Sequence, residues 1–191
     1  MKHQTHFFIA VPIEIDLRKA IHNWLANNKG NLPFQSWVHQ EDYHITLAFL
    51  GQIDADDQLK RLSKLVKDKI VNLPPFSLSV KGLGVFGKKD TPRIFWAGIE
   101  DSSSLIYLQK QVFHACQEIG FNLDSKPFRP HITLARRWKS DKPFVTPELF
   151  LEAIHNEHQT FIVKEIHLYQ THLDRFPKYE AIDVFDLKGD K

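Results

Sequence analysis

The pentapeptide HITLA occurs twice in the chain, in HITLAFL at residues 44–50 and in HITLARR at residues 131–137. Internal repetition is examined first because it reveals how a fold is organised. In both copies polar and apolar side chains alternate, a pattern typical of a β-strand that buries one face. The repeat therefore predicts two equivalent strands, one in each half of the chain.

The elements around the two copies also repeat. Apolar runs rich in β-branched and aromatic residues predict strands at Phe7–Val11, His44–Leu50, Phe76–Phe86, Arg93–Ile99, His131–Arg137, Phe161–Thr171 and Tyr179–Leu187. Helical spacing predicts helices between them, with apolar faces of Leu17, Ile21, Trp24 and Leu25, of Leu59, Leu62, Leu65, Val66 and Leu73, and of Leu105, Leu108, Val112, Ala115 and Ile119. The expected helix ends are Asp54 as a cap, Asp101 or Ser102 as a cap, Gly120 as a stop, and Thr146-Pro147 as the start of a short fourth helix.

Residues 1–90 thus have the order β-α-β-α-β, and residues 91–191 have the order β-α-β-α-β-β. We expect one α+β domain over residues 1–191 that consists of two pseudo-symmetric lobes, one from each half. Each lobe should be an antiparallel or mixed sheet with helices on its outer face, and a central cleft should separate the lobes.

Composition limits the class of protein. Lys and Arg number 25 against 23 Asp and Glu, a net charge of +2, so binding of nucleic acid by bulk charge is not expected and anion binding must be local. The single cysteine, Cys116, excludes an internal disulfide and fits a reducing cytoplasm. The apolar run Phe7–Val11 is too short for a signal segment or a membrane span. No feature calls for a protein partner, and a monomer is expected.

Alternation assigns the same side chains to one face of each repeated strand, namely His44, Thr46 and Ala48 in the first copy and His131, Thr133 and Ala135 in the second. If a two-fold axis relates the lobes, two histidines and two threonines surround one cavity. One imidazole can accept a proton while the other donates one, and threonine hydroxyls can donate to phosphate oxygens. These groups suit a 2′,3′-cyclic phosphate without a metal. A duplicated strand kept only for packing is the competing interpretation.

The two motifs, His44-Ile45-Thr46-Leu47 and His131-Ile132-Thr133-Leu134, resemble the paired H-x-T-x signatures of the 2H phosphoesterases. FFIAVPI, WVHQEDYHITLAFLG, PRIFWAGI and FRPHITLAR add to the similarity, which spans nearly the whole chain. The resemblance is strongest to the bacterial RNA 2′,3′-cyclic phosphodiesterases, which are LigT-like and are also called 2′-5′ RNA ligases.

The resemblance implies hydrolysis of RNA 2′,3′-cyclic phosphate ends to 2′-phosphate ends, and a reverse-type joining of tRNA halves by a 2′-5′ bond. RNA ends or nucleoside cyclic phosphates would be the partners, without a metal or another cofactor. It also implies that His44 is the proton donor and His131 the proton acceptor, although nothing in the sequence itself distinguishes the two roles. In one departure from the family pattern, Thr171 stands for a serine and no glycine precedes Tyr179, which leaves the turn between them open.

Other candidate residues have two interpretations each. Arg129, Arg136 and Arg137 can form a basic rim that guides RNA, or can belong to a solvated surface. Alternation turns Arg137 toward the His131 face, whereas the resemblance favours Arg136. Phe8 and Phe95 can stack on a terminal base or pack in the core.

Two further classes of protein stay open as rivals: a non-catalytic module that holds a nucleoside monophosphate or an RNA end, and a phosphodiesterase for a small cyclic phosphate or an oligoadenylate. His155 and His158 have i, i+3 spacing that suits either a metal ion or a polar surface. The sequence contains no G-x-x-x-x-G-K-S/T loop, which argues against a nucleoside triphosphate site.

Overall fold

The structure, a computed structural model, describes residues 5–53, 56–148, 150–153 and 159–189. Its strands are β1 (Phe7–Pro12), β2 (Phe34–Trp37), β3 (His44–Gly51), β4 (Phe76–Gly87), β5 (Pro92–Ile99), β6 (His131–Trp138), β7 (Thr160–Val163), β8 (Glu165–Thr171) and β9 (Tyr179–Asp186). Its helices are α1 (Ile15–Asn28), α2 (Asp56–Ile70), α3 (Ser103–Glu118) and α4 (Phe150–Ala153), with short 3-10 turns η1 (Lys29–Asn31) and η2 (Gln40–Asp42).

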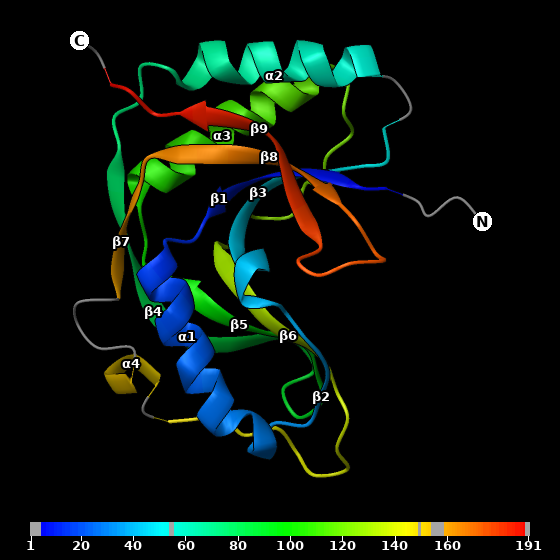
Figure 1. The fold of residues 1–191 in the computed structure, drawn as a ribbon, viewed down its shortest axis with the longest axis vertical. Helices are drawn as coiled ribbons and strands as arrows, with labels where there is room; N and C mark the ends of the chain where they lie inside the picture. The colour runs from blue at the N-terminus through cyan, green and yellow to red at the C-terminus, as the bar shows by residue number, and fades with distance from the viewer. Residues whose placement is uncertain (1–4, 54–55, 149, 154–158, 190–191) are drawn as a thin grey trace.

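The strands form one sheet in the order β7-β4-β5-β6-β3-β1-β8-β9, and β2 pairs with β6 outside this path. The strand pairings are antiparallel. Helices pack around this sheet, which confirms the predicted α+β class (Figure 1). At the centre β3 pairs with β6 through Ile45 opposite Ile132, so the two HITLA strands meet.

The two sequence halves do not form separate lobes, which corrects the predicted division into residues 1–90 and 91–191. β4 belongs to the first half but pairs with β5 of the second, and β8 of the second half pairs with β1 of the first. Helices from the two halves also contact each other: α3 lies beside α2 at the β9 end of the molecule, and α1 lies beside α4 (Figure 1). We call β3, β1, β8 and β9 the β3 side, and β6, β5, β4, β7 and β2 the β6 side.

The ends of α3 follow from local chemistry. The hydroxyl of Ser102 accepts a hydrogen bond from the backbone N–H of Leu105 at 3.2 Å, so Ser102 rather than Asp101 caps the helix. Gly120 follows the helix with a φ of 94°, a conformation that glycine adopts without the steric cost of a side chain. Both ends of this helix were therefore visible in the sequence.

Other predicted ends differ. α4 begins at Phe150 rather than at Thr146-Pro147. The strand predicted over Phe161–Thr171 is two strands, β7 and β8, which pair with β4 and β1 at opposite ends of the sheet. The predicted cap Asp54 and the pair His155 and His158 lie outside the described residues. No described helix has the length and the apolar character that crossing a membrane requires.

Most residues of the predicted apolar faces are buried, which confirms the periodicities that defined them. Leu59, Leu65, Leu73 and Ile119 are partly buried against the same core, and Leu73 lies beyond the end of α2. Fully enclosed residues of the three long helices and the two HITLA strands include Leu17, Ile21, Leu62, Val66, Leu105, Leu108, Val112, Ile45, Ile132 and Leu134. Burial of this continuous set stabilises the fold, because each enclosed aliphatic side chain contributes roughly 1.5–3 kcal/mol relative to exposure. The core fixes one face of β3 and β6 and leaves their opposite face for chemistry.

Candidate active site

The central pairing brings the four predicted polar side chains together. The bridge between β3 and β6 joins the residue after His44 to the residue after His131. In this antiparallel register, His44 lies next to Thr133 and Thr46 lies next to His131, on the face opposite to the core. All four side chains are partly exposed. The structure therefore places two imidazoles and two hydroxyls around one point, as the repeat predicted.

Both imidazoles are held in the same way. Nδ1 of His44 donates to the backbone carbonyl of Asp42 at 2.7 Å, and Nδ1 of His131 donates to the carbonyl of Arg129 at 2.7 Å. A carbonyl only accepts, so the neutral rings carry their hydrogen on Nδ1 and leave Nε2 for proton transfer. Nε2 of His44 lies 3.1 Å from the hydroxyl of Thr46. The two copies of the repeat therefore share the same histidine tautomer as well as the same strand conformation.

Aromatic rings enclose both histidines. The ring of Phe8 lies 4.8 Å from that of His44, and Tyr179 meets His44 edge-on at 5.1 Å. On the β6 side, Phe86 meets His131 edge-on at 4.8 Å. These contacts restrict ring rotation and remove part of each imidazole from water, which changes its titration.

The pKa of His44 is lowered from 6.5 to about 4, chiefly by burial; the hydrogen bond to Asp42 opposes this shift, and the nearby charges of His131 and Arg136 contribute to it. The pKa of His131 is lowered as well, chiefly by burial, with the charge of Arg136 in the same direction. Both rings are therefore neutral in the free protein near pH 7.

Both HITLA strands contain a β-bulge at the leucine, so the predicted alternation of side chains does not continue beyond that residue. The register between β1 and β3 skips Leu47, and the register between β5 and β6 skips Leu134. A bulge turns two successive side chains to the same face. Ala48 and Ala135 are accordingly buried, with 5% and 0% of their surfaces exposed, and do not lie beside the histidines as predicted.

The bulge returns Arg136 to the face of His131. The charge of Arg136 lowers the pKa values of both site histidines and opposes the raised pKa of Tyr179. Arg137, the other arginine that the sequence left open, is exposed with a φ of 61°, in the left-handed region, and its charge is not among the causes that shift the pKa of either histidine. Arg136 is therefore the arginine that lies near the two imidazoles.

The predicted aromatic platforms are covered. Phe95 has no exposed surface and stacks on Phe34 at 5.4 Å, so the prediction that Phe95 binds a base is wrong. Phe8 lies at the site, but only 4% of its surface is exposed, because one face of its ring stacks on Tyr169 at 5.2 Å. Phe8 supports the ring of His44 instead of offering an open face.

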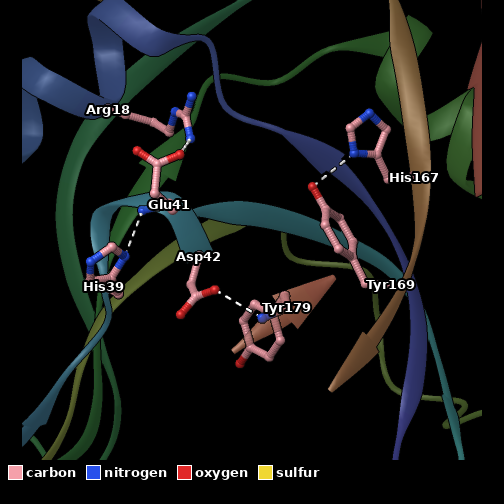
Figure 2. Close-up of polar contacts among 7 residues, drawn as sticks. All are labelled: Arg18, His39, Glu41, Asp42, His167, Tyr169 and Tyr179. Carbon is pink, nitrogen blue, oxygen red and sulfur yellow. Dashed lines mark hydrogen bonds and ion pairs between the residues drawn. The ribbon is translucent and has the colours of Figure 1, made fainter. Parts of the chain in front are cut away.

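Asp42 is a residue of the site that the sequence pattern did not predict. Its carboxylate, in a residue that is 3% exposed, accepts hydrogen bonds from the backbone N–H groups of Lys178 and Tyr179 at 3.0 Å each. The bond to Tyr179 is drawn in Figure 2. The turn before Tyr179 contains no glycine, and Asp42 holds it from the end of η2. Nothing in the local sequence marks this aspartate, because its partners lie far along the chain.

A second polar group lies behind Phe8, on the β3 side. His167 places Nδ1 at 3.0 Å from the hydroxyl of Tyr169 and Nε2 at 2.7 Å from Glu165, while Arg18 pairs with Glu41 (Figure 2). Burial raises the pKa of Tyr169 to about 12, so its phenol stays neutral. Within the described part of the chain, no group of three or more His, Cys, Asp or Glu side chains is placed to hold a metal ion.

Comparison with known proteins adds to this geometry. The family model of the 2′-5′ RNA ligase superfamily matches residues 15–175. The RNA 2′,3′-cyclic phosphodiesterase of Geobacillus stearothermophilus is 42% identical over 186 residues, which is 97% of this chain but 58% of that protein. The RNA 2′,3′-cyclic phosphodiesterase of Bacillus subtilis is 34% identical over 96% of this chain and 97% of its own length.

Solved structures share the fold. LigT of E. coli, complexed with 3′-AMP, superposes with a TM-score of 0.78 at 24% identity and covers 97% of this chain and 99% of its own. The protein TT0787 of Thermus thermophilus has a TM-score of 0.77 at 25% identity and covers 97% of this chain and 100% of its own. From the matched family model and the identity to full-length relatives, the chain belongs to the 2′-5′ RNA ligase superfamily.

Proposed function

We propose that this protein hydrolyses the 2′,3′-cyclic phosphate ends of RNA to 2′-phosphate ends by a two-histidine mechanism. The observation that carries the proposal is the matched pair of imidazoles, each held through Nδ1 to a backbone carbonyl so that Nε2 is available for proton transfer. Nε2 of His44 also lies beside the hydroxyl of Thr46. Family membership and the names of the relatives support the same substrate.

In this mechanism Nε2 of His131 takes a proton from water, whose oxygen forms a bond to phosphorus. The bond from phosphorus to the ribose 3′ oxygen breaks, and that oxygen receives a proton from Nε2 of His44. Thr46 and Thr133 donate hydrogen bonds to the oxygens that do not react, and Arg136 balances their charge. The bound phosphate raises the pKa of His44, because a negative charge favours the protonated imidazole.

The same site would accept the 5′-hydroxyl of a second RNA in place of water, and a 2′-5′ bond would form when the 3′ oxygen leaves. Membership of the 2′-5′ RNA ligase superfamily supports this second reaction. It is tested by incubation of a cyclic-ended RNA with a 5′-hydroxyl RNA, followed by analysis of any joined product for a 2′-5′ linkage.

The direct test is hydrolysis of a cyclic-ended oligonucleotide with and without EDTA, followed by identification of the phosphate position in the product. We expect turnover to persist with EDTA. Substitution of His44 or His131 by alanine should lower kcat by about two to four orders of magnitude, the usual contribution of a general acid or base. Unchanged turnover in either variant would refute the two-histidine mechanism.

Two rival functions are separated by the same substrates. A module that only binds nucleoside monophosphates would show AMP binding by calorimetry without turnover of any cyclic phosphate. A phosphodiesterase for small cyclic phosphates or oligoadenylates would turn those over faster than cyclic-ended RNA in a product screen by mass spectrometry. The paired proton-transfer groups support catalysis, since binding alone needs donors and not two titrating rings.

A further inference from the structure

We propose that the nucleotides preceding the cyclic phosphate bind in a groove that leads away from Thr46 and His131 across Phe49, so that the protein prefers an oligonucleotide end to a mononucleotide. This rests on the proposed function, because the groove and the candidate active site share those two residues.

The groove is large and continuous with the site. It has a volume of about 1220 Å³ and runs between β3, the second half of α3 and the segment 122–129. Its lining includes Phe49, Gln109, Lys110, Phe113, Lys126 and Arg129. Sites for one small molecule usually measure about 300–1,000 Å³. The groove therefore has space for more than the terminal nucleotide.

The groove exists because β2 has no counterpart on the β3 side. On the β6 side, β2 continues the sheet beyond the central bridge, with Trp37 opposite Ala135 and Phe34 opposite Trp138. On the β3 side, residues 121–130 precede β6 as β2 precedes β3, but they contain no strand, and β3 pairs with β6 at Ile45 alone among the described residues. The edge of β3 beyond Ile45 thus borders an open groove instead of another strand.

Phe49 is placed to stack on a base. The bulge in β3 returns Phe49 to the face of His44 and Thr46, as the equivalent bulge returns Arg136 to the face of His131. Phe49 is 58% exposed, unlike Phe8 and Phe95. It lies about 10 Å along the strand from Thr46, at roughly 3.3 Å per residue, so its ring is beyond the phosphate site. The ring of His6 lies 5.8 Å from that of Phe49, and a base of a preceding nucleotide would meet the exposed part of the Phe49 ring.

Cationic side chains line the same groove as the ring of Phe49. Lys110, Lys126 and Arg129 line the groove, and Asp124 is the acidic side chain in the same lining. Asp124 and Lys126 form an exposed ion pair at 2.8 Å, which leaves Lys110 and Arg129 for phosphate oxygens. An aromatic ring beside a local excess of positive charge is the usual design of a groove for single-stranded nucleic acid. The small net charge of the whole chain is compatible with such a local site.

The test compares a nucleoside 2′,3′-cyclic phosphate with a trinucleotide that carries the same cyclic end. We expect kcat/KM to be at least about tenfold higher for the trinucleotide. Phe49→Ala should reduce that preference at least about fivefold, the lower end of the contribution of one base stacked on an aromatic side chain. Tyr107→Ala is the matched control, because Tyr107 is 52% exposed on α3 but lines a different hollow.

A second measurement uses binding without chemistry. In the His131→Ala variant, the affinity for a trinucleotide 2′-phosphate should fall with salt, and Lys110→Ala should lower the slope of log affinity against log salt by about 0.7. Lys64→Ala on α2 should leave the slope unchanged. Equal kcat/KM for the two substrates, with no effect of Phe49→Ala on their ratio, would overturn the groove while the proposed hydrolysis stands. Absence of hydrolysis of both substrates would instead overturn the proposed function.

Discussion

At the scale of single residues, the site combines two neutral histidines with one nearby arginine. A reaction that needs one charged and one neutral imidazole in the free enzyme proceeds fastest at a pH between their two pKa values. The pKa of His44 is lowered to about 4 and that of His131 is also lowered from 6.5.

We therefore expect the bell-shaped profile of kcat/KM against pH to have its maximum below pH 6.5. Initial rates at substrate concentrations far below KM, at constant ionic strength, measure this profile. The maximum for kcat should lie at higher pH, because the bound phosphate raises the pKa of the acid. A kcat/KM maximum above neutrality would contradict the burial of both rings.

A second residue-scale prediction distinguishes the two neighbouring arginines. Arg136→Ala should lower kcat/KM by about 100-fold or more, the usual cost of losing a group that stabilises developing negative charge. It should also move the kcat/KM maximum to higher pH, since the charge of Arg136 lowers the pKa of both histidines. Arg137→Ala is the control and should change neither quantity. Equal losses in the two variants would count against the bulged geometry.

The sequence predicted the site residues that repeat. It did not predict side-chain positions that depend on contacts between distant segments. His44, Thr46, His131 and Thr133 were visible because the motif recurs on equivalent strands. The choice between Arg136 and Arg137 was not, because a bulge depends on the register of the partner strand, which simple alternation ignores.

At the scale of elements, the contact between Asp42 and the start of β9 ties two distant segments beside His44. Asp42→Ala should destabilise the protein by about 1–3 kcal/mol, because two partly buried backbone N–H groups lose their acceptor. For a chain of this size the melting temperature should fall by roughly 2–4 °C per kcal/mol. Thermal unfolding followed by circular dichroism measures the change. Asp174→Ala, in the exposed turn before β9, is the control, and equal melting temperatures would contradict the assigned role of Asp42.

Elements with strong local patterns were predicted well, and elements defined by pairing were not. α3 was delimited by Ser102 and Gly120, and β3 and β6 by their alternation. β2 was missed because four residues, FQSW, carry too little pattern. The run 161–171 was predicted as one strand because Lys164 gives no turn pattern, although it separates two strands with different partners.

At the scale of the whole molecule, the two sequence halves are interlocked. β4 and β5 pair across the boundary between the halves, and β1 has β8 as one of its two neighbours. The sequence predicted the order of elements but assigned each half its own lobe, since order alone does not determine which strands pair.

Interlocking predicts how fragments behave. A fragment of residues 1–90 should show no cooperative thermal transition, because β1 and β4 lack their partners β8 and β5. A mixture with residues 91–191 should recover a cooperative transition, measurable by circular dichroism and by tryptophan fluorescence. Independent, reversible folding of either fragment would show that the halves are autonomous domains.

The two repeated strands have unequal flanks, because a further strand extends one of them and not the other. This inequality bears on the orientation in which a molecule can bind. A centre with two identical flanks would hold a chain-like molecule equally well in either orientation. Here β2 pairs with β6 on one flank, and no described strand pairs with the corresponding edge of β3, so the proposed groove would receive such a molecule from one end only. The two imidazoles are held in the same way but have different neighbours, and in the proposed mechanism this difference would assign each of them a single role. In the proposed reaction, the difference between the two flanks, rather than the similarity of the two histidines, would set the direction in which the substrate binds.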